Sequence, residues 1–119
     1  MPILEVEIVL QSSEVLPPNL ARELADQAAA VFDAGPGTTW VRLRALPAQY
    51  YAENGGIPAG VSPVFVSVLK RSLLPLEERR VEAARLAVVI AALCGRPPEN
   101  VHILYLPVAA GRMAFGGEL

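Results

Sequence analysis

Apolar and polar residues alternate along the first part of the chain. In residues 3–10 the even-numbered positions are all apolar, whereas Glu5 and Glu7 lie between them. A period of two is typical of a β-strand, because successive side chains point to opposite faces. The pattern therefore predicts a strand over residues 3–10, with one buried face and one partly solvated face.

Three further stretches also predict strands. Residues 40–46 place Arg42 and Arg44 on one face and apolar side chains on the other. Residues 64–71 are apolar on both faces almost to their end, which is typical of a central strand. Residues 101–106 are also mostly apolar.

Two stretches with a helical period lie between these strands. The first follows Pro17-Pro18, residues that are tolerated at a helix start, and its apolar positions form one inward stripe. That stripe consists of Leu20, Leu24, Ala28 and Val31. The second begins near Pro75, with Glu77 and Glu78 in its first turn, where the helix dipole favours acids. The second helix is apolar over much of its circumference, so we expect it to be covered on more than one side.

The order of these elements indicates two copies of one unit. Pro2 and Pro63 each begin an apolar run, followed by a loop, a helical stretch, a glycine and proline signal, a strand that closes in Leu-Pro, and a Gly-Gly pair. The order and spacing of these markers agree in the two halves, although few side chains match. We therefore predict two β-α-β repeats, residues 2–56 and 63–117, joined by a short linker, residues 57–62.

The repeats predict an α+β fold in a single domain, residues 1–119. Two β-α-β units with short connections form a four-stranded mixed sheet with both helices on one face. No element remains to cover the other face of the sheet. The chain is 53% hydrophobic, with a mean hydropathy of +0.40. We therefore expect copies of the chain to pack their open sheet faces together.

Charge and cysteine content exclude several classes of function. The net charge is -2 and no basic block is present, which argues against partners such as nucleic acid or an anionic membrane. The longest apolar run, residues 86–94, is too short to span a bilayer. The first residues include Glu5 and Glu7, whereas a secretory signal peptide would carry basic residues there, so we expect no signal peptide. The single Cys94 excludes an internal disulfide. We expect a cytoplasmic protein.

The start and the end of the chain resemble one protein family. Met1-Pro2-Ile3, the duplicated unit and residues 110–119 with their Gly-Gly pair are similar to the tautomerase superfamily. Its members include 4-oxalocrotonate tautomerase, 5-carboxymethyl-2-hydroxymuconate isomerase and macrophage migration inhibitory factor. The resemblance covers nearly the whole chain. It implies a long, two-unit member, and because such members form trimers it implies a homotrimer.

The resemblance also implies a catalytic role for Pro2, in a pocket between subunits. Removal of Met1 would leave Pro2 with a secondary amine. An ordinary α-amino group has a pKa of about 7.7–8.0, and an apolar pocket that contains cations lowers it. Such an amine suits general base catalysis near neutral pH. The implied reaction is a keto-enol or 1,3-allylic isomerisation of a small 2-hydroxy-dienoate or enol carboxylate, without a cofactor. The alternative is that Pro2 only begins a strand, as Pro63 does.

Carboxylate substrates require cations in the pocket, and two arginines are candidates. Arg42 lies in a segment that resembles the stretch carrying a catalytic arginine in 4-oxalocrotonate tautomerase. Arg71 lies where long members, including a haloacrylate dehalogenase and a malonate semialdehyde decarboxylase, place a substrate-binding arginine. An arginine holds a carboxylate at two points and stabilises charge on an enolate. Lys70 is a weaker candidate. Both arginines are alternatively surface residues that pair with acids.

Two aromatic residues complete the candidate binding site. Tyr51, in a polar loop, is a possible hydrogen-bond donor to the substrate, and the alternative is an anchor for a subunit contact. Phe115 is a candidate apolar wall of the pocket, and the alternative is simple packing. His102 lies in a predicted strand, so we expect a structural role for it.

The chain also departs from the family at several positions. Ser12 falls near an arginine of 4-oxalocrotonate tautomerase, and Met113 near a phenylalanine in its tail. Gly35 falls near the lysine of macrophage migration inhibitory factor, and His102 and Leu104 fall near its tyrosine and asparagine. These departures leave the substrate open.

Two other functions therefore stay open beside the isomerase. One is a decarboxylase or hydratase that uses Pro2 as an acid, and the other is a non-enzymatic trimeric interaction protein. No cluster of His, Cys or acidic residues suits a metal, and no glycine-rich phosphate loop follows a strand. We expect no metal and no cofactor in any of the three cases.

Overall fold

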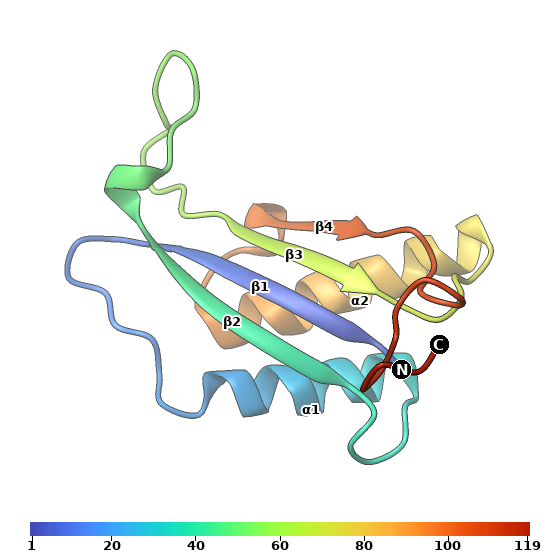
Figure 1. Cartoon of the computed structure of the whole chain (residues 1–119). Coiled ribbons are helices and arrows are strands. Elements are labelled where there is room, and N and C mark those ends of the chain that lie inside the picture. Colours follow the sequence, from blue (N-terminus) through green and yellow to red (C-terminus); the bar gives the residue numbers. More distant parts are fainter.

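The computed structural model describes residues 1–119 and contains one sheet and two long helices (Figure 1). The elements in chain order are β1 (Ile3–Leu10), α1 (Leu20–Phe32), β2 (Trp40–Pro47), the 3-10 turn η1 (Ala48–Tyr50), β3 (Val64–Leu69), α2 (Leu76–Cys94), the 3-10 turn η2 (Pro98–Asn100) and β4 (Val101–Tyr105). The four strands lie in the order β2-β1-β3-β4. This architecture confirms the predicted α+β fold with a four-stranded mixed sheet.

Strand pairing follows the two repeats. Strand β1 pairs in parallel with β2, and β3 pairs in parallel with β4. The two central strands, β1 and β3, are antiparallel, with Val6 opposite Val66. The register of the first pair sets Ile3 beside Trp40. Parallel strands begin at the same edge of a sheet, so the residues just before β1 and at the start of β2 lie together.

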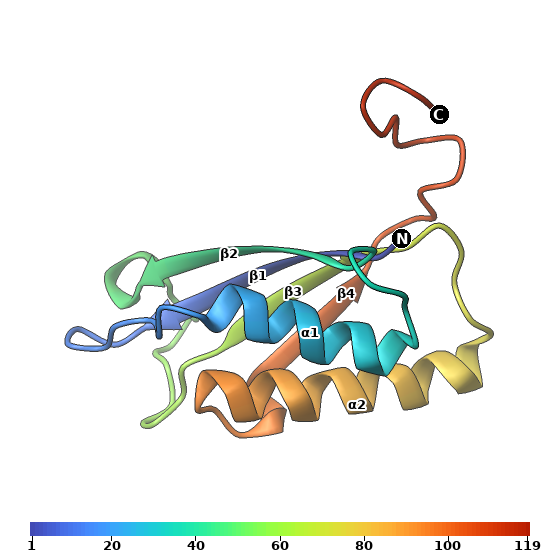
Figure 2. The same ribbon diagram turned by 90° about the horizontal axis from the view of Figure 1, so that it is seen from below.

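The core lies between the sheet and the helices, which cover one face of the sheet (Figure 2). Alternate residues of β1 and β3 point into it: Leu4, Val6, Ile8, Val64, Val66 and Val68. Helix α1 contributes the predicted stripe of Leu20, Leu24, Ala28 and Val31. The period of two in the strands and the helical period in α1 are thus both realised as buried faces.

Three predictions made from the sequence differ from the structure. Strands β3 and β4 end at Leu69 and Tyr105, earlier than the predicted residues 71 and 106. Backbone pairing continues beyond them, since the Ala109 N–H donates to the carbonyl of Lys70 over 2.8 Å, but as an irregular tail. Helix α2 packs against the sheet and against α1, but its cover is less complete than predicted, because Val81 and Val88 on its outer face are 59% and 56% exposed. The apolar residues of α2 exceed what one sheet face and one neighbouring helix can bury.

The second face of the sheet carries no covering element of the same chain (Figure 2). Arg42 and Arg44 stand on its β2 side, and Phe65, His102 and Leu104 stand on its β3–β4 side. Leu104 is 60% exposed. This face is therefore a mixed surface of charges and apolar side chains.

Neither of the two helices is long and apolar enough to cross a membrane.

Candidate active site

The candidate site lies at the end of the sheet where β1 and β2 begin. Pro2 directly precedes β1 and is buried, whereas Met1 is exposed above it. The Trp40 N–H donates to the carbonyl of Pro2 over 3.0 Å, which extends the parallel ladder by one residue. Pro2 is thereby fixed at the sheet edge, with its ring nitrogen bonded to Met1.

The C-terminal tail crosses this end of the sheet (Figure 1) and rises from the face opposite the helices (Figure 2). Its course is set by the bond from Ala109 to Lys70 and by a turn in which the Phe115 N–H donates to the carbonyl of Glu118 over 2.8 Å. The Phe115 ring meets Trp40 edge to face, with 5.8 Å between ring centroids. This geometry is favourable for aromatic pairs, and it holds the tail against β2.

The tail and the sheet edge enclose a cavity of about 470 Å³. Its lining consists of Met1, Trp40, Arg71, Ala109, Ala110, Gly111, Met113, Phe115 and Leu119. Most of these side chains are apolar, and Arg71 supplies the one basic side chain. Arg71 is exposed and forms no ion pair with an acidic side chain. A free guanidinium beside apolar walls suits a small ligand with one carboxylate.

The structure brings together some of the residues predicted from the sequence. Arg71 and Phe115 line the cavity, and Pro2 follows Met1, which lines it too. Arg42 does not line it. Instead, Arg42 projects from the open sheet face and forms an ion pair with Glu5, which Arg44 also contacts at 3.1 Å. Within one chain, the predicted alternative for Arg42, pairing with a surface acid, is the arrangement found.

Lys70 lies on the helix side of the sheet, away from this cavity. Its Nζ is 3.0 Å from an oxygen of the buried Glu82 and 5.0 Å from the centre of the Phe32 ring. The Tyr105 hydroxyl donates to the other Glu82 oxygen over 2.9 Å. Burial, and then this contact with Glu82, raise the pKa of Tyr105 well above its usual range. Lys70 and Arg71 diverge because successive residues of an extended segment point to opposite sides.

Tyr51 lies at the opposite end of β1. Its hydroxyl donates to Glu53 over 2.6 Å, and its ring packs beside Phe65 with 5.8 Å between centroids. The bond to Glu53 raises the pKa of Tyr51. Tyr51 lines a second hollow, of about 500 Å³, beneath the linker between the repeats. Within one chain it does not reach the cavity beside Met1.

Trp40 and Met113 are lining residues that sequence reasoning did not select. The signal for Trp40 was present, because a parallel β-α-β unit places the first residue of β2 beside the first residue of β1. Met113 belongs to a tail without a regular period, so its position depends on the backbone bonds that fold the tail back. The sequence pattern therefore could not predict the path of the tail or the position of Met113.

Comparison with known proteins gives matches of structure only, since no protein-family model and no curated protein matches the sequence. The macrophage migration inhibitory factor of Trichinella spiralis superposes with a TM-score of 0.75 at 11% identity, covering 98% of this chain and 97% of that one. A fused 4-OT wild-type symmetric trimer superposes with a TM-score of 0.77 at 17% identity, covering 98% and 94%.

A third similar structure is of a protein inactivated by 2-oxo-3-pentynoate, with a TM-score of 0.75 at 19% identity over 98% of this chain and 94% of that one. All three likenesses extend over nearly the full length of both chains, so they include the two helices and all four strands. The fold implied by the Met-Pro start, the duplicated unit and the Gly-Gly ending is confirmed. This chain has the fold of the tautomerase superfamily, to which 4-oxalocrotonate tautomerase and macrophage migration inhibitory factor belong.

Proposed function

We propose that this protein is a cofactor-independent tautomerase that moves a proton between oxygen and carbon, or between two carbons, of a small enol or 2-hydroxy-dienoate carboxylate. The observation that carries the proposal is the position of Pro2. It is buried at the sheet edge directly below Met1, which lines an apolar cavity whose one basic side chain is Arg71. Removal of Met1 would convert the Pro2 nitrogen from an amide into a secondary amine facing that cavity.

The proposed reaction needs a base and a cation. The Pro2 amine takes the hydroxyl proton of the enol, the electrons of that O–H bond form the carbonyl, and the carbon that gains electron density takes the proton back from Pro2. No proton is gained or lost overall. Arg71 holds the substrate carboxylate at two points and stabilises negative charge as it spreads over the enolate. The apolar walls and the nearby guanidinium both disfavour a charged amine, which keeps the Pro2 amine unprotonated at neutral pH and able to accept a proton.

The lining favours an isomerase over a reaction in which Pro2 acts as an acid. No aspartate or glutamate side chain lines the cavity, so the lining supplies no acidic side chain to activate water for hydration. The structure inactivated by 2-oxo-3-pentynoate supports the same choice of ligand, because that inactivator carries a keto group beside a carboxylate.

We further propose that the protein is a homotrimer in which the open sheet faces of three copies meet. The exposed Phe65 and Leu104 on that face support this proposal, as does the trimeric state of the fused 4-OT. In such an assembly Arg42 and Tyr51, which are remote from the cavity within one chain, would face a neighbouring subunit. Light scattering would give the mass of the assembly directly.

The test is ultraviolet monitoring of the ketonisation of 2-hydroxymuconate and phenylenolpyruvate, with intact mass used to check loss of Met1. We expect Pro2→Ala to lower kcat/KM by at least about 100-fold, the lower end of the contribution of a general base. The matched control is Pro63→Ala, since Pro63 is also buried and directly precedes β3, but its nitrogen is an amide. Equal rates in wild type and Pro2→Ala, with the trimer intact, would refute the proposed role of Pro2.

A further inference from the structure

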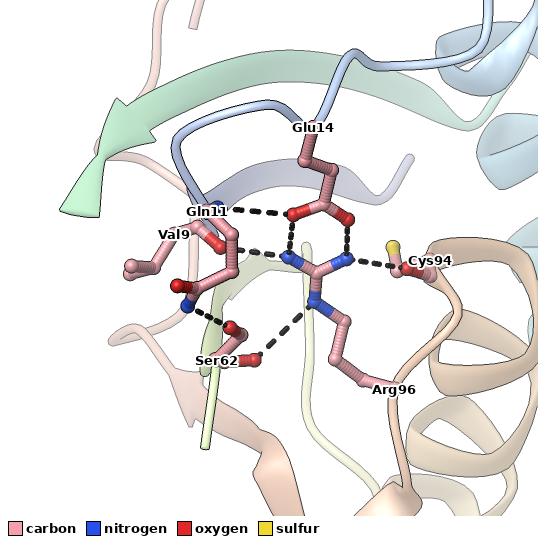
Figure 3. Close-up of polar contacts among 6 residues, drawn as sticks. All are labelled: Val9, Gln11, Glu14, Ser62, Cys94 and Arg96. Atoms are coloured by element: carbon pink, nitrogen blue, oxygen red, sulfur yellow. Dashed lines mark hydrogen bonds and ion pairs between the residues drawn. The ribbon is translucent and has the colours of Figure 1, made fainter. Parts of the chain in front are cut away.

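A buried arginine lies at the end of the sheet opposite Pro2. Arg96 follows Gly95, which ends helix α2 in the left-handed conformation with a φ of 69°. The turn directs the Arg96 side chain toward Ser62, just before β3 (Figure 3), where it is 5% exposed. A buried guanidinium is costly unless all of its N–H groups are satisfied.

Three backbone carbonyls fix the orientation of this guanidinium. Its Nε donates to the carbonyl of Ser62 over 3.3 Å, one Nη donates to the carbonyl of Cys94 over 2.7 Å, and the other donates to the carbonyl of Val9 over 2.7 Å (Figure 3). These carbonyls belong to the linker, the end of α2 and the end of β1. Arg96 is therefore held by the main chain of three segments, independently of any acidic side chain.

A carboxylate occupies the two N–H groups that remain. Glu14 binds Arg96 at two points, with 2.8 Å between its Oε1 and the Nη that also contacts Val9, and the backbone N–H of Gln11 donates to Oε1 over 3.2 Å. The bond from Arg96 holds the pKa of Glu14 below its usual range. Glu14 lies in the irregular loop after β1, and its side chain is 33% exposed. The carboxylate thus reaches the buried guanidinium from the solvent side.

We infer that the pocket of Arg96 is a binding site for a small carboxylate, and that the chain's own Glu14 occupies it. The receptor consists of the guanidinium, oriented by three carbonyls, and of the Gln11 N–H. All of these remain when the Glu14 side chain is removed. A polar hollow of about 240 Å³ adjoins them, lined in part by Ser62, Arg96 and Asn100, and leaves room for a free carboxylate of the size of acetate. Tethering keeps Glu14 at high effective concentration, so wild-type protein excludes free carboxylates from this end.

The experiment compares Glu14→Ala with the wild type in thermal unfolding, titrated with sodium acetate and with sodium chloride at the same ionic strength. Acetate should raise the unfolding midpoint of Glu14→Ala with a logarithmic dependence on its concentration, by on the order of 5 °C at about ten times its dissociation constant. Acetate bound at Arg71 would shift both proteins alike, so the difference between them reports the Arg96 site. This readout does not depend on catalysis by Pro2.

Two further variants serve as controls. Glu77→Ala removes another acid that pairs with an arginine, at an exposed position on α2, and it should respond to acetate as the wild type does. Adding Arg96→Ala to Glu14→Ala should abolish the acetate effect. If Glu14→Ala folds in acetate but not in chloride, the inference is supported. Equal midpoints in the two salts, or failure to fold in either, would overturn it, because a free carboxylate would then not replace Glu14.

Discussion

A parallel pair of strands begins at each end of the sheet, β1 with β2 and β3 with β4, yet the two ends use an arginine in opposite ways. At the Pro2 end, Arg71 is exposed, forms no ion pair and faces an apolar cavity of about 470 Å³. At the Pro63 end, Arg96 is 5% exposed, and the main chain and Glu14 together take every N–H of its guanidinium. The proline differs too, because Pro63 is an internal residue whose nitrogen is an amide.

The contrast shows that the same kind of side chain is free for ligand binding at one end of the sheet and serves stability at the other. A guanidinium with unused N–H groups is available to a ligand, whereas one with all five engaged holds segments together. We therefore expect substitutions of Arg71 to change activity and substitutions of Arg96 to change stability. The predictions below test that division, beginning with the largest effect.

Arg96→Ala should be the most destabilising arginine substitution in the chain. It leaves Glu14 without its basic partner and removes the donors to three carbonyls, and breaking a buried ion pair costs about 3–5 kcal/mol of unfolding free energy. Denaturant unfolding at fixed protein concentration measures this loss. Activity per folded molecule should stay near that of the wild type. A loss below about 1 kcal/mol would show that the segments hold together without Arg96.

Arg71→Ala should have the reverse profile. Loss of charged hydrogen bonds to the substrate carboxylate, worth about 1.5–3 kcal/mol, should lower kcat/KM by about 10- to 100-fold, while the unfolding free energy changes little because Arg71 is exposed. Arg85→Ala is the matched control, since Arg85 is exposed on the outer face of α2, far from the cavity. An equal loss in both variants would remove Arg71 from the proposed site.

The sequence predicted the site of Arg71 at one end of the sheet but not the ion pair of Arg96 at the other. Periodicity gave strand β1 and helix α1, because each has one buried face, and apolar runs gave β3 and β4. The role of Arg71 beside Pro2 was implied by the resemblance to the tautomerase superfamily and not by the pattern. The Arg96–Glu14 pair joins residues 82 positions apart, through loops that carry no period. A pairing of that kind depends on how three irregular segments meet, so no local pattern identified it.

The pH dependence of stability should differ between the wild type and Glu14→Gln. The folded-state pKa of Glu14 lies below its ordinary value of 4.5, so the ionised pair stabilises the fold fully above the unfolded pKa, and that contribution is lost as pH falls through the folded pKa. The stability advantage of the wild type should therefore be constant near pH 7 and shrink below about pH 4.5. Denaturant unfolding at a series of pH values measures it. An advantage that persisted unchanged at pH 3 would mean that Glu14 stabilises by shape and not by charge.

The smallest effect should come from an ion pair that lacks burial. Glu77 and Arg80 are 3.3 Å apart on the surface of α2, with both side chains more than 60% exposed. Water screens such a pair, so Glu77→Ala should change the unfolding free energy by less than about 0.5 kcal/mol. Comparison of its loss of unfolding free energy with that of Arg96→Ala distinguishes the effect of burial from the effect of forming an ion pair. If the two substitutions cost the same, pairing alone would account for the stability of the Pro63 end. The three carbonyls around Arg96 would then contribute little, because they would be equally well satisfied by water.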